Sequence, residues 1–359
     1  MSYYILPKNN NISVLEPKYD ENESVPFVSH SINNYYNELY NQISLICQNN
    51  KDLSGNTFSE LIKIINPYEF IFSKVPGSKF SVSKLKPNSN TFYDFLEILL
   101  TLNIFESYKS QNIHSLHISE NNEDTIECKE MLRENFQDNV LSYKKVDDEL
   151  FKSLNERKLD FMFIDTISEN LNSYFVNLIQ CVMIILKCST ENSTTIIKIH
   201  HTLHKPVLDI LYFLCSLFDK VYIMKPNSNN VTTFEKYIIC KNFQHNDSKN
   251  EIYKINYYKL FVFLKKLENR NIVTIINKEL PSYFLNKVDD INIIMGQQQL
   301  EALGQIITVL KNKNKDDKIE SIKKSNIQKS VSWCEKYKIP CNKFTEKTNI
   351  FLPIVKENS

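Results

Sequence analysis

Glycine is scarce in this chain. The 359 residues include four glycines: Gly55, Gly77, Gly296 and Gly304. Glycine-rich turns let a backbone approach a phosphate or cofactor closely and adopt positive φ without strain. The long stretch between Gly77 and Gly296 therefore excludes a conventional glycine-rich cofactor loop.

Other common signals are absent too. The eight cysteines form no CxxC pair, which favours buried free thiols over a metal or disulfide framework. A net charge of +1 predicts no global attraction to nucleic acid or membrane, so a binding surface would have to be local. The N-terminus has neither a basic nor an apolar signal region, so we expect no secretory signal. The longest apolar run, Tyr174 to Cys188, is too short and too polar to span a bilayer and predicts a buried helix.

Strand-like and helix-like segments alternate through the middle of the chain. Because short connections separate them, they predict an α/β fold with a mainly parallel sheet covered on both faces. The last two strands could pair antiparallel at one edge. The expected strands are 113–119, 159–165, 193–200, 220–226 and 235–243, and the expected helices are 92–105, 125–135, 173–188 and 206–218.

The flanking regions differ in character and suggest three parts. Residues 1–65 read as a polar N-terminal arm followed by helical spacing, and residues 66–245 contain the alternation. Residues 246–359 read as a mostly helical extension, with a lysine-rich stretch at 311–330 that is a solvated helix or a linker.

Several separated segments resemble the FtsJ-like methyltransferases, in particular those of large DNA viruses. They are "NPYEF" (66–70), "SVSKLKPNSNTFYDFLEI" (81–98), "LHISENNEDTIE" (116–127), "LDFMFID" (159–165), "TTIIKI" (194–199) and "VYIMKPNSNNVTTFEKYIIC" (221–240). The resemblance covers roughly residues 60–245. It implies a Rossmann-like methyltransferase sheet with an antiparallel edge strand, and methylation of RNA ribose 2′-hydroxyls with S-adenosylmethionine as cofactor.

The family surrounds the ribose with a Lys–Asp–Lys–Glu tetrad, in which a lysine of lowered pKa takes the hydroxyl proton. The resemblance places three of these catalytic positions at Asp165, Lys198 and Glu235. The first lysine of the family falls on Asp94, in "FYDFLEI", and Lys84 and Lys86 of the basic loop are the alternative candidates for its place.

The cofactor turn also departs from the family, which has a glycine-rich sequence after His-Leu-Ala-Glu. Here the chain continues from Ile118 through Ser119 into Glu120, Asn121 and Asn122, followed by Glu123 and Asp124. We interpret residues 120–122 as a degenerate cofactor-binding loop. The adjacent acidic pair, Glu123 and Asp124, would repel the carboxylate of S-adenosylmethionine. If these changes alone abolished activity, glycine at 121, 123 and 124 together with Asp94→Lys would restore it.

Two hypotheses follow. The first is a catalytically degenerate homologue, a pseudoenzyme that serves as an RNA-binding or subunit-binding module in mRNA capping or modification. The second is an active RNA (cap) 2′-O-ribose methyltransferase with an atypical cofactor loop. Either implies RNA, including capped mRNA, and a capping or RNA-processing protein as partners, no membrane, and a cytoplasmic location such as a viral replication site or virion.

Three smaller features have competing interpretations. His200, His201 and His204 predict a polar loop, because a metal site would need a helix and a third ligand. The resemblance implies contact of this loop with the RNA backbone as an alternative. The basic loop containing Lys74, Lys79, Lys84, Lys86 and Phe80 is either an RNA contact or an ordinary solvated loop. Trp333 is expected to anchor the C-terminal helices to the core.

Overall fold

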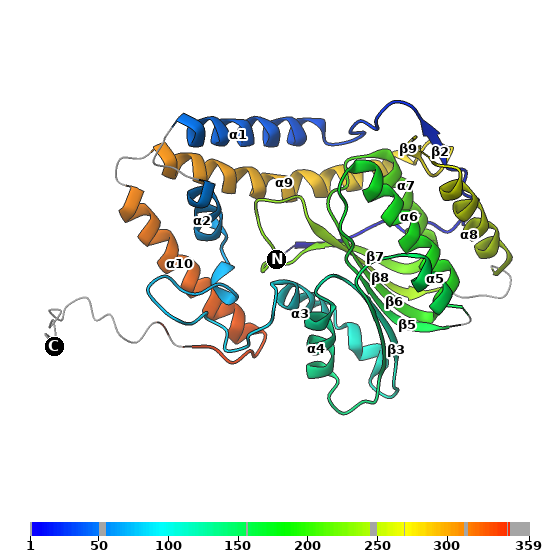
Figure 1. The fold of residues 1–359 in the computed structure, drawn as a ribbon, viewed down its shortest axis with the longest axis horizontal. Helices are drawn as coiled ribbons and strands as arrows, with labels where there is room; N and C mark the ends of the chain where they lie inside the picture. The colour runs from blue at the N-terminus through cyan, green and yellow to red at the C-terminus, as the bar shows by residue number, and fades with distance from the viewer. Residues whose placement is uncertain are drawn as a thin grey trace, which may run out of the picture.

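A computed structural model describes residues 2–49, 55–155, 157–244, 250–268, 270–311, 315–342 and 344 (Figure 1). Its centre is a seven-stranded sheet. The strands are β1 (Ser2–Ile5), β3 (His114–Ile118), β4 (Asn139–Tyr143), β5 (Leu159–Ile164), β6 (Ser189–Ile199), β7 (Phe218–Lys225) and β8 (Lys236–Phe243). Their spatial order is β4-β3-β5-β6-β8-β7-β1.

The sheet is mixed with a largely parallel core, which confirms the predicted methyltransferase-like α/β fold. Strands β4, β3, β5 and β6 run parallel, and β8 runs antiparallel to both β6 and β7. The expected pairing of the last two strands is therefore present, but β8 lies inside the sheet. Its residues Tyr237 to Cys240 are all fully buried, as suits a strand covered on both faces.

The antiparallel edge strand is β1, which pairs with β7. This differs from our expectation that the first residues form an arm outside the core. The short run from Tyr3 to Leu6 alternates between exposed and more buried side chains, with Tyr3 and Ile5 each 48% exposed and Leu6 4% exposed. Such alternation suits a strand with one solvated face.

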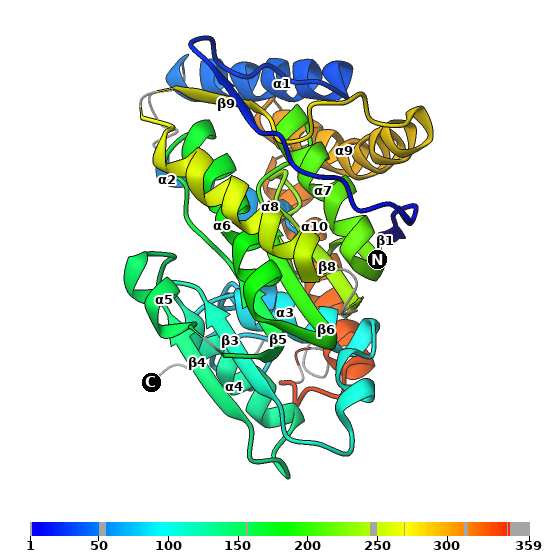
Figure 2. The same cartoon turned by 90° about the vertical axis from the view of Figure 1, so that its right-hand side faces the viewer.

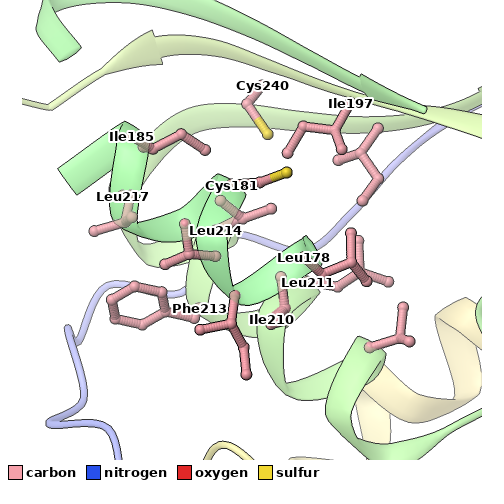
Figure 3. Close-up of a cluster of buried hydrophobic side chains, with 14 of the residues drawn as sticks. Leu178, Cys181, Ile185, Ile197, Ile210, Leu211, Phe213, Leu214, Leu217 and Cys240 are labelled. Atoms are coloured by element: carbon pink, nitrogen blue, oxygen red, sulfur yellow. The ribbon is translucent and has the colours of Figure 1, made fainter. Parts of the chain in front are cut away.

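Helices cover both faces of the sheet. Helices α6 (Leu171–Cys188) and α7 (Lys205–Leu217) pack on one face, where their side chains meet Ile197 and Cys240 of the sheet (Figure 3). Helices α3 (Thr91–Thr101) and α4 (Asn122–Leu132) pack on the other face. Strand β5 serves both clusters, because Met162 belongs to the first and Phe161 to the second.

Helix α6 is the expected buried helix. Contrary to the expectation from the sequence, the helix is long and apolar enough to suit a membrane span, because it begins at Leu171, but 56% of it is buried inside the molecule. It lies between the sheet and α8 (Asn250–Lys265), which crosses it on the outside (Figure 2). These contacts are those of a core helix in a globular fold.

The regions before and after the alternation pack against each other. Helix α1 (His30–Asn49) lies along α9 (Ser282–Lys311) in both views (Figures 1 and 2). Strands β2 (Lys18–Asp20) and β9 (Asn271–Thr274) form a separate two-stranded sheet, which the sequence had not predicted. Helix α2 (Gly55–Ile65) joins α1 and α9 in a small core of its own.

Helix α10 (Lys315–Lys336) connects the C-terminal region to the α3 face. Its residues Val331, Trp333 and Cys334 belong to the same hydrophobic cluster as α3. The predicted lysine-rich stretch is thus helical from Lys315 onward, and residues 312–314 and 345–359 lie outside the described part of the chain. The remaining short elements are α5 (Asp148–Ser153), η1 (Glu69–Ile71) and η2 (Ile104–Tyr108).

Candidate functional site

Three of the sequence-predicted site residues lie together at one edge of the sheet. Asp165 directly follows β5, and Lys198 is the last but one residue of the parallel neighbour β6. Glu235 directly precedes β8, whose antiparallel direction brings its start to the same edge. This is the carboxyl edge of the parallel strands, where open α/β sheets bind their ligands.

Lys198 bridges the two carboxylates. Its Nζ lies 3.5 Å from Oδ2 of Asp165 and 3.6 Å from Oε2 of Glu235. Burial acts to lower the pKa of Lys198, but the carboxylates of Asp165, Glu235 and Asp94 outweigh it, and the pKa is raised. The ammonium form is therefore the stable form of Lys198 in this arrangement.

Asp94 is the fourth residue of the site and is 3% exposed. Its carboxylate accepts hydrogen bonds from the Ser228 hydroxyl at 2.6 Å, the Asn229 amide at 2.7 Å and the Tyr237 hydroxyl at 3.0 Å. Burial raises the pKa of Asp94, against these hydrogen bonds and the charge of Lys198, which lower it. Asp94 thus ties α3 to β8 and to the loop that follows β7.

A second buried carboxylate, Glu97, acts one helical turn later. It accepts from the backbone N–H groups of Asn227 at 3.0 Å and Ser228 at 3.3 Å, and from the Trp333 indole at 2.8 Å. Glu97 therefore links α3 both to the loop after β7 and to helix α10. Trp333 is the expected anchor of the C-terminal helices, and its ring also meets Tyr93 edge-on.

Two lysines near this site, the partly buried Lys225 and the buried Lys236, were not singled out from the sequence. Lys225 Nζ donates to Asn229 Oδ1 and to the backbone carbonyls of Thr233 and Glu235 at 2.8–3.0 Å. Burial lowers the pKa of Lys225 to about 7 and that of Lys236 to about 8. The signals available were the Lys-Pro dipeptide at Lys225 and the position of Lys236 next to Glu235.

The turn after β3 holds the three residues predicted as a degenerate cofactor loop. Glu120 and Asn121 are exposed, and the Asn122 amide donates to the Tyr143 carbonyl at 3.2 Å. None of residues 119–124 has positive φ, and Asn121 has φ −108°. The turn therefore does not use the conformation for which glycine is needed.

Asp124, in the first turn of α4, is fully buried and holds the segment that leads into α3. Its carboxylate accepts from the Asn88 backbone N–H at 2.8 Å and from the Ser89 hydroxyl at 2.5 Å. A carboxylate is favourable near a helix N-terminus, and in α4 the side chain of Asp124 supplies that carboxylate. The N-terminal end of α4 is consequently covered by the protein's own chain at Asp124.

The histidines form part of a loop, as predicted. Residues 200–203 are not helical, and α7 begins at Lys205. The rings of His201 and His204 lie 4.7 Å apart between centroids, and burial lowers their pKa values to about 3 and about 4. Among the residues that the structure describes, no group of three or more His, Cys, Asp or Glu side chains could hold a metal ion.

Comparisons with known proteins add distant structural likenesses. No protein-family model matches the sequence, and no curated protein matches it. Human methyltransferase-like protein 13, in complex with SAH, is similar to this chain at 12% identity and a TM-score of 0.30, over 48% of this chain and 93% of its own. A protein from Streptococcus thermophilus described as a hemolysin is similar at 14% identity and a TM-score of 0.26, over 52% and 78% respectively. The fold assignment rests on the strand order and directions of the sheet.

Proposed function

We propose that this chain is a homologue of the FtsJ-like RNA 2′-O-methyltransferases that is catalytically degenerate and acts as an RNA-binding or subunit-binding module in mRNA capping or modification. The observation that carries the proposal is Asp94, a buried carboxylate at the position of the family's first lysine. It adds a third negative group to the surroundings of Lys198 and helps to raise the pKa of that lysine. A lysine that acts as general base needs a lowered pKa.

The turn after β3 supports the same proposal. A cofactor with a carboxylate, such as S-adenosylmethionine, is bound in this fold family by backbone groups of a glycine turn. Here Glu120 and Glu123 are exposed at the turn, and Asp124 is engaged by Asn88 and Ser89. These residues do not fit a negatively charged cofactor group, because like charges repel.

A second candidate function is an active, S-adenosylmethionine-dependent RNA 2′-O-ribose methyltransferase. The ion pairs of Lys198 with Asp165 and Glu235 support it, since the resemblance implies that these three groups act together. In that case a bound substrate would have to displace at least one carboxylate and so lower the pKa of Lys198, and the ammonium would have to release its proton to solvent before the lysine could accept the proton of the hydroxyl. The partners we propose in either case are RNA, including capped mRNA, and a capping or RNA-processing protein in the cytoplasm.

Calorimetric titration with S-adenosylmethionine, and separately with its demethylated product, tests the two functions against each other. The degenerate homologue is expected to give no binding heat while far-ultraviolet circular dichroism shows a folded protein. Micromolar binding followed by methyl transfer to capped RNA, lost in Lys198→Ala, would establish the active enzyme and refute the first proposal.

A further inference from the structure

A basic cavity lies beside the segment that leads into α3. Its volume is about 480 Å³. The lining includes exposed Lys74, Lys79, Lys84 and Lys86, together with the Phe80 ring, which is 56% exposed. A cavity lined by several cations and one accessible aromatic ring differs from an ordinary solvated loop, because these groups share one concave surface.

Among the residues that the structure describes, none forms an ion pair with the lysines of this cavity. Within the described part of the chain, no carboxylate lies within 4.0 Å of the four ammonium groups, although ion pairs occur elsewhere. The whole chain carries a net charge of only +1, so this concentration is local. Uncompensated lysines that share one concave surface attract a ligand with several negative charges.

Hydrogen bonds fix the backbone of the loop that carries the lysines. The Val75 N–H donates to the Phe80 carbonyl at 3.0 Å across a turn in which Gly77 has φ +79°. The Lys84 N–H donates to the Pro340 carbonyl at 2.8 Å, and the Asn342 N–H donates to the Val82 carbonyl at 2.8 Å. The segment after α10 therefore supports the loop backbone, so that mainly the lysine side chains remain to be ordered when a ligand binds.

We infer that this cavity binds single-stranded nucleic acid, with the lysines on backbone phosphates and the Phe80 ring stacked on a base. The combination of several unpaired lysines with one exposed ring matches the way in which single strands are held without sequence preference. Phosphate alone would explain the lysines and leave the exposed ring without a role. The inference rests on the proposed function only for the choice of RNA as the natural polymer.

The chain segment that follows the cavity lining leads to residues beside the candidate site. The segment after Lys86 is fixed by Asp124, and Asn90 donates to the Ser228 carbonyl at 2.6 Å, next to the contacts of Asp94. A strand bound at the lysines would therefore lie next to the segment that contacts Asp124 and Ser228.

Fluorescence anisotropy of a labelled ten-nucleotide oligouridylate, with a DNA strand of the same length as a second probe, tests the inference. The double variant Lys84→Gln/Lys86→Gln is expected to weaken binding by about tenfold or more at low salt. It should also reduce the salt slope by about 0.7 for each phosphate that the variant no longer neutralises. Phe80→Ala is expected to weaken binding at least about fivefold because a stacked base loses its partner, with the salt slope unchanged.

The matched control is Lys254→Gln/Lys266→Gln, which removes the same charge from exposed positions on and just after α8. Equal weakening by this pair would overturn the inference, because net charge alone would then explain binding. So would unchanged binding in the loop variants, or no binding at about 100 µM protein, the weak limit of non-specific affinity. Loop-dependent binding of either polymer supports it. The result is independent of cofactor calorimetry, so failure here would leave the degenerate-homologue proposal standing.

Discussion

The carboxylate of Asp94 is surrounded by donors from two other parts of the chain, namely Ser228, Asn229 and Tyr237. All three groups donate hydrogen bonds toward residue 94, so the side chain at this position has to be a hydrogen-bond acceptor. A lysine at this position would bring a buried ammonium group, three further donors of its own, and no acceptor. Asp94 has thus become part of the packing between α3, β8 and the loop after β7.

The variant Asp94→Lys is expected to lower the free energy of unfolding by about 3 kcal/mol or more, because it leaves a buried charge and several polar groups without partners. Asp94→Asn keeps the shape and an acceptor oxygen, and is expected to cost about 1 kcal/mol. Urea denaturation followed by circular dichroism measures both. Equal stability of Asp94→Lys and wild type would show that the contacts of Asp94 contribute little. The same destabilisation would keep Asp94→Lys from restoring activity even with glycines placed in the turn.

The buried ring of His117 makes the stability of the fold depend on pH. The ring is fully buried, contacts Phe95, Phe161 and Phe163, and places Nδ1 2.9 Å from the Thr125 hydroxyl. Burial lowers its pKa from 6.5 to about 3. Between pH 6.5 and about 3, His117 binds a proton in the unfolded chain but not in the folded chain. The free energy of unfolding therefore falls as the pH falls, by about 1.4 kcal/mol per pH unit from this residue.

The free energy of unfolding should therefore depend on pH more steeply in the wild type than in His117→Asn. Below pH 6 the variant is expected to lose about 1.4 kcal/mol per pH unit less than wild type, as measured by urea denaturation at several pH values. Buried His201 and His204 act in the same direction, and the raised pKa values of buried carboxylates act in the opposite one. Both proteins share these groups, so they cancel in the difference. Parallel pH profiles would contradict the burial of a neutral His117.

At the scale of elements, α9 offers a matched pair of glycines. A methyl group at Gly296 would lie 2.6 Å from Cγ2 of Ile32 in α1, whereas nothing lies within 4 Å of the same position at Gly304. Gly296 is therefore needed where α1 and α9 approach closely, and Gly304 is not.

Gly304→Ala is expected to raise the free energy of unfolding by up to about 1 kcal/mol through helix propensity. Gly296→Ala is expected to lower it by about 1–3 kcal/mol, because the added methyl overpacks the contact with Ile32. Thermal denaturation measures both, and adding Ile32→Ala to Gly296→Ala should recover part of the stability. If Gly296→Ala and Gly304→Ala changed the free energy of unfolding equally, this would contradict the close approach of α1 and α9 at Gly296.

The elements that the sequence predicted are those with long apolar runs. Strands β5 and β8, and helices α6 and α7, were found within a few residues of their ends because their runs are continuous and bounded by polar turns. Strand β4 was missed, since its five residues are partly exposed and only weakly patterned. Strands β1 and β9 were missed because four residues are too few to show a period.

For the molecule as a whole, the fluorescence of Trp333 reports on the contact between α10 and α3. It is the only tryptophan in the chain, and its indole donates to Glu97 across the contact between α10 and α3. Its side chain is 3% exposed. If the flanking helices and the sheet unfold as one cooperative unit, tryptophan fluorescence and far-ultraviolet circular dichroism will give coincident urea transitions.

We expect that coincidence for the wild type. Glu97→Gln keeps the shape and an acceptor, whereas Glu97→Ala removes the acceptor and is expected to shift the fluorescence transition to lower urea than the circular dichroism transition. A fluorescence transition that already comes first in the wild type would show that α10 leaves the α3 face before the sheet unfolds.

The alternation of strands and helices, and with it the sheet and its two apolar faces, could be predicted from the sequence because it depends on local periodicity. The residue types that end the strands are also visible there, so Asp165, Lys198 and Glu235 could be expected at one edge. The roles of Asp94 and Asp124 required the folded molecule, because their partners, Ser228 and Asn229 for one and Asn88 and Ser89 for the other, lie at least 35 residues away. The direction of the pKa shift at Lys198 likewise depends on how many carboxylates surround it and how deeply all are buried, and a linear chain does not encode those distances locally.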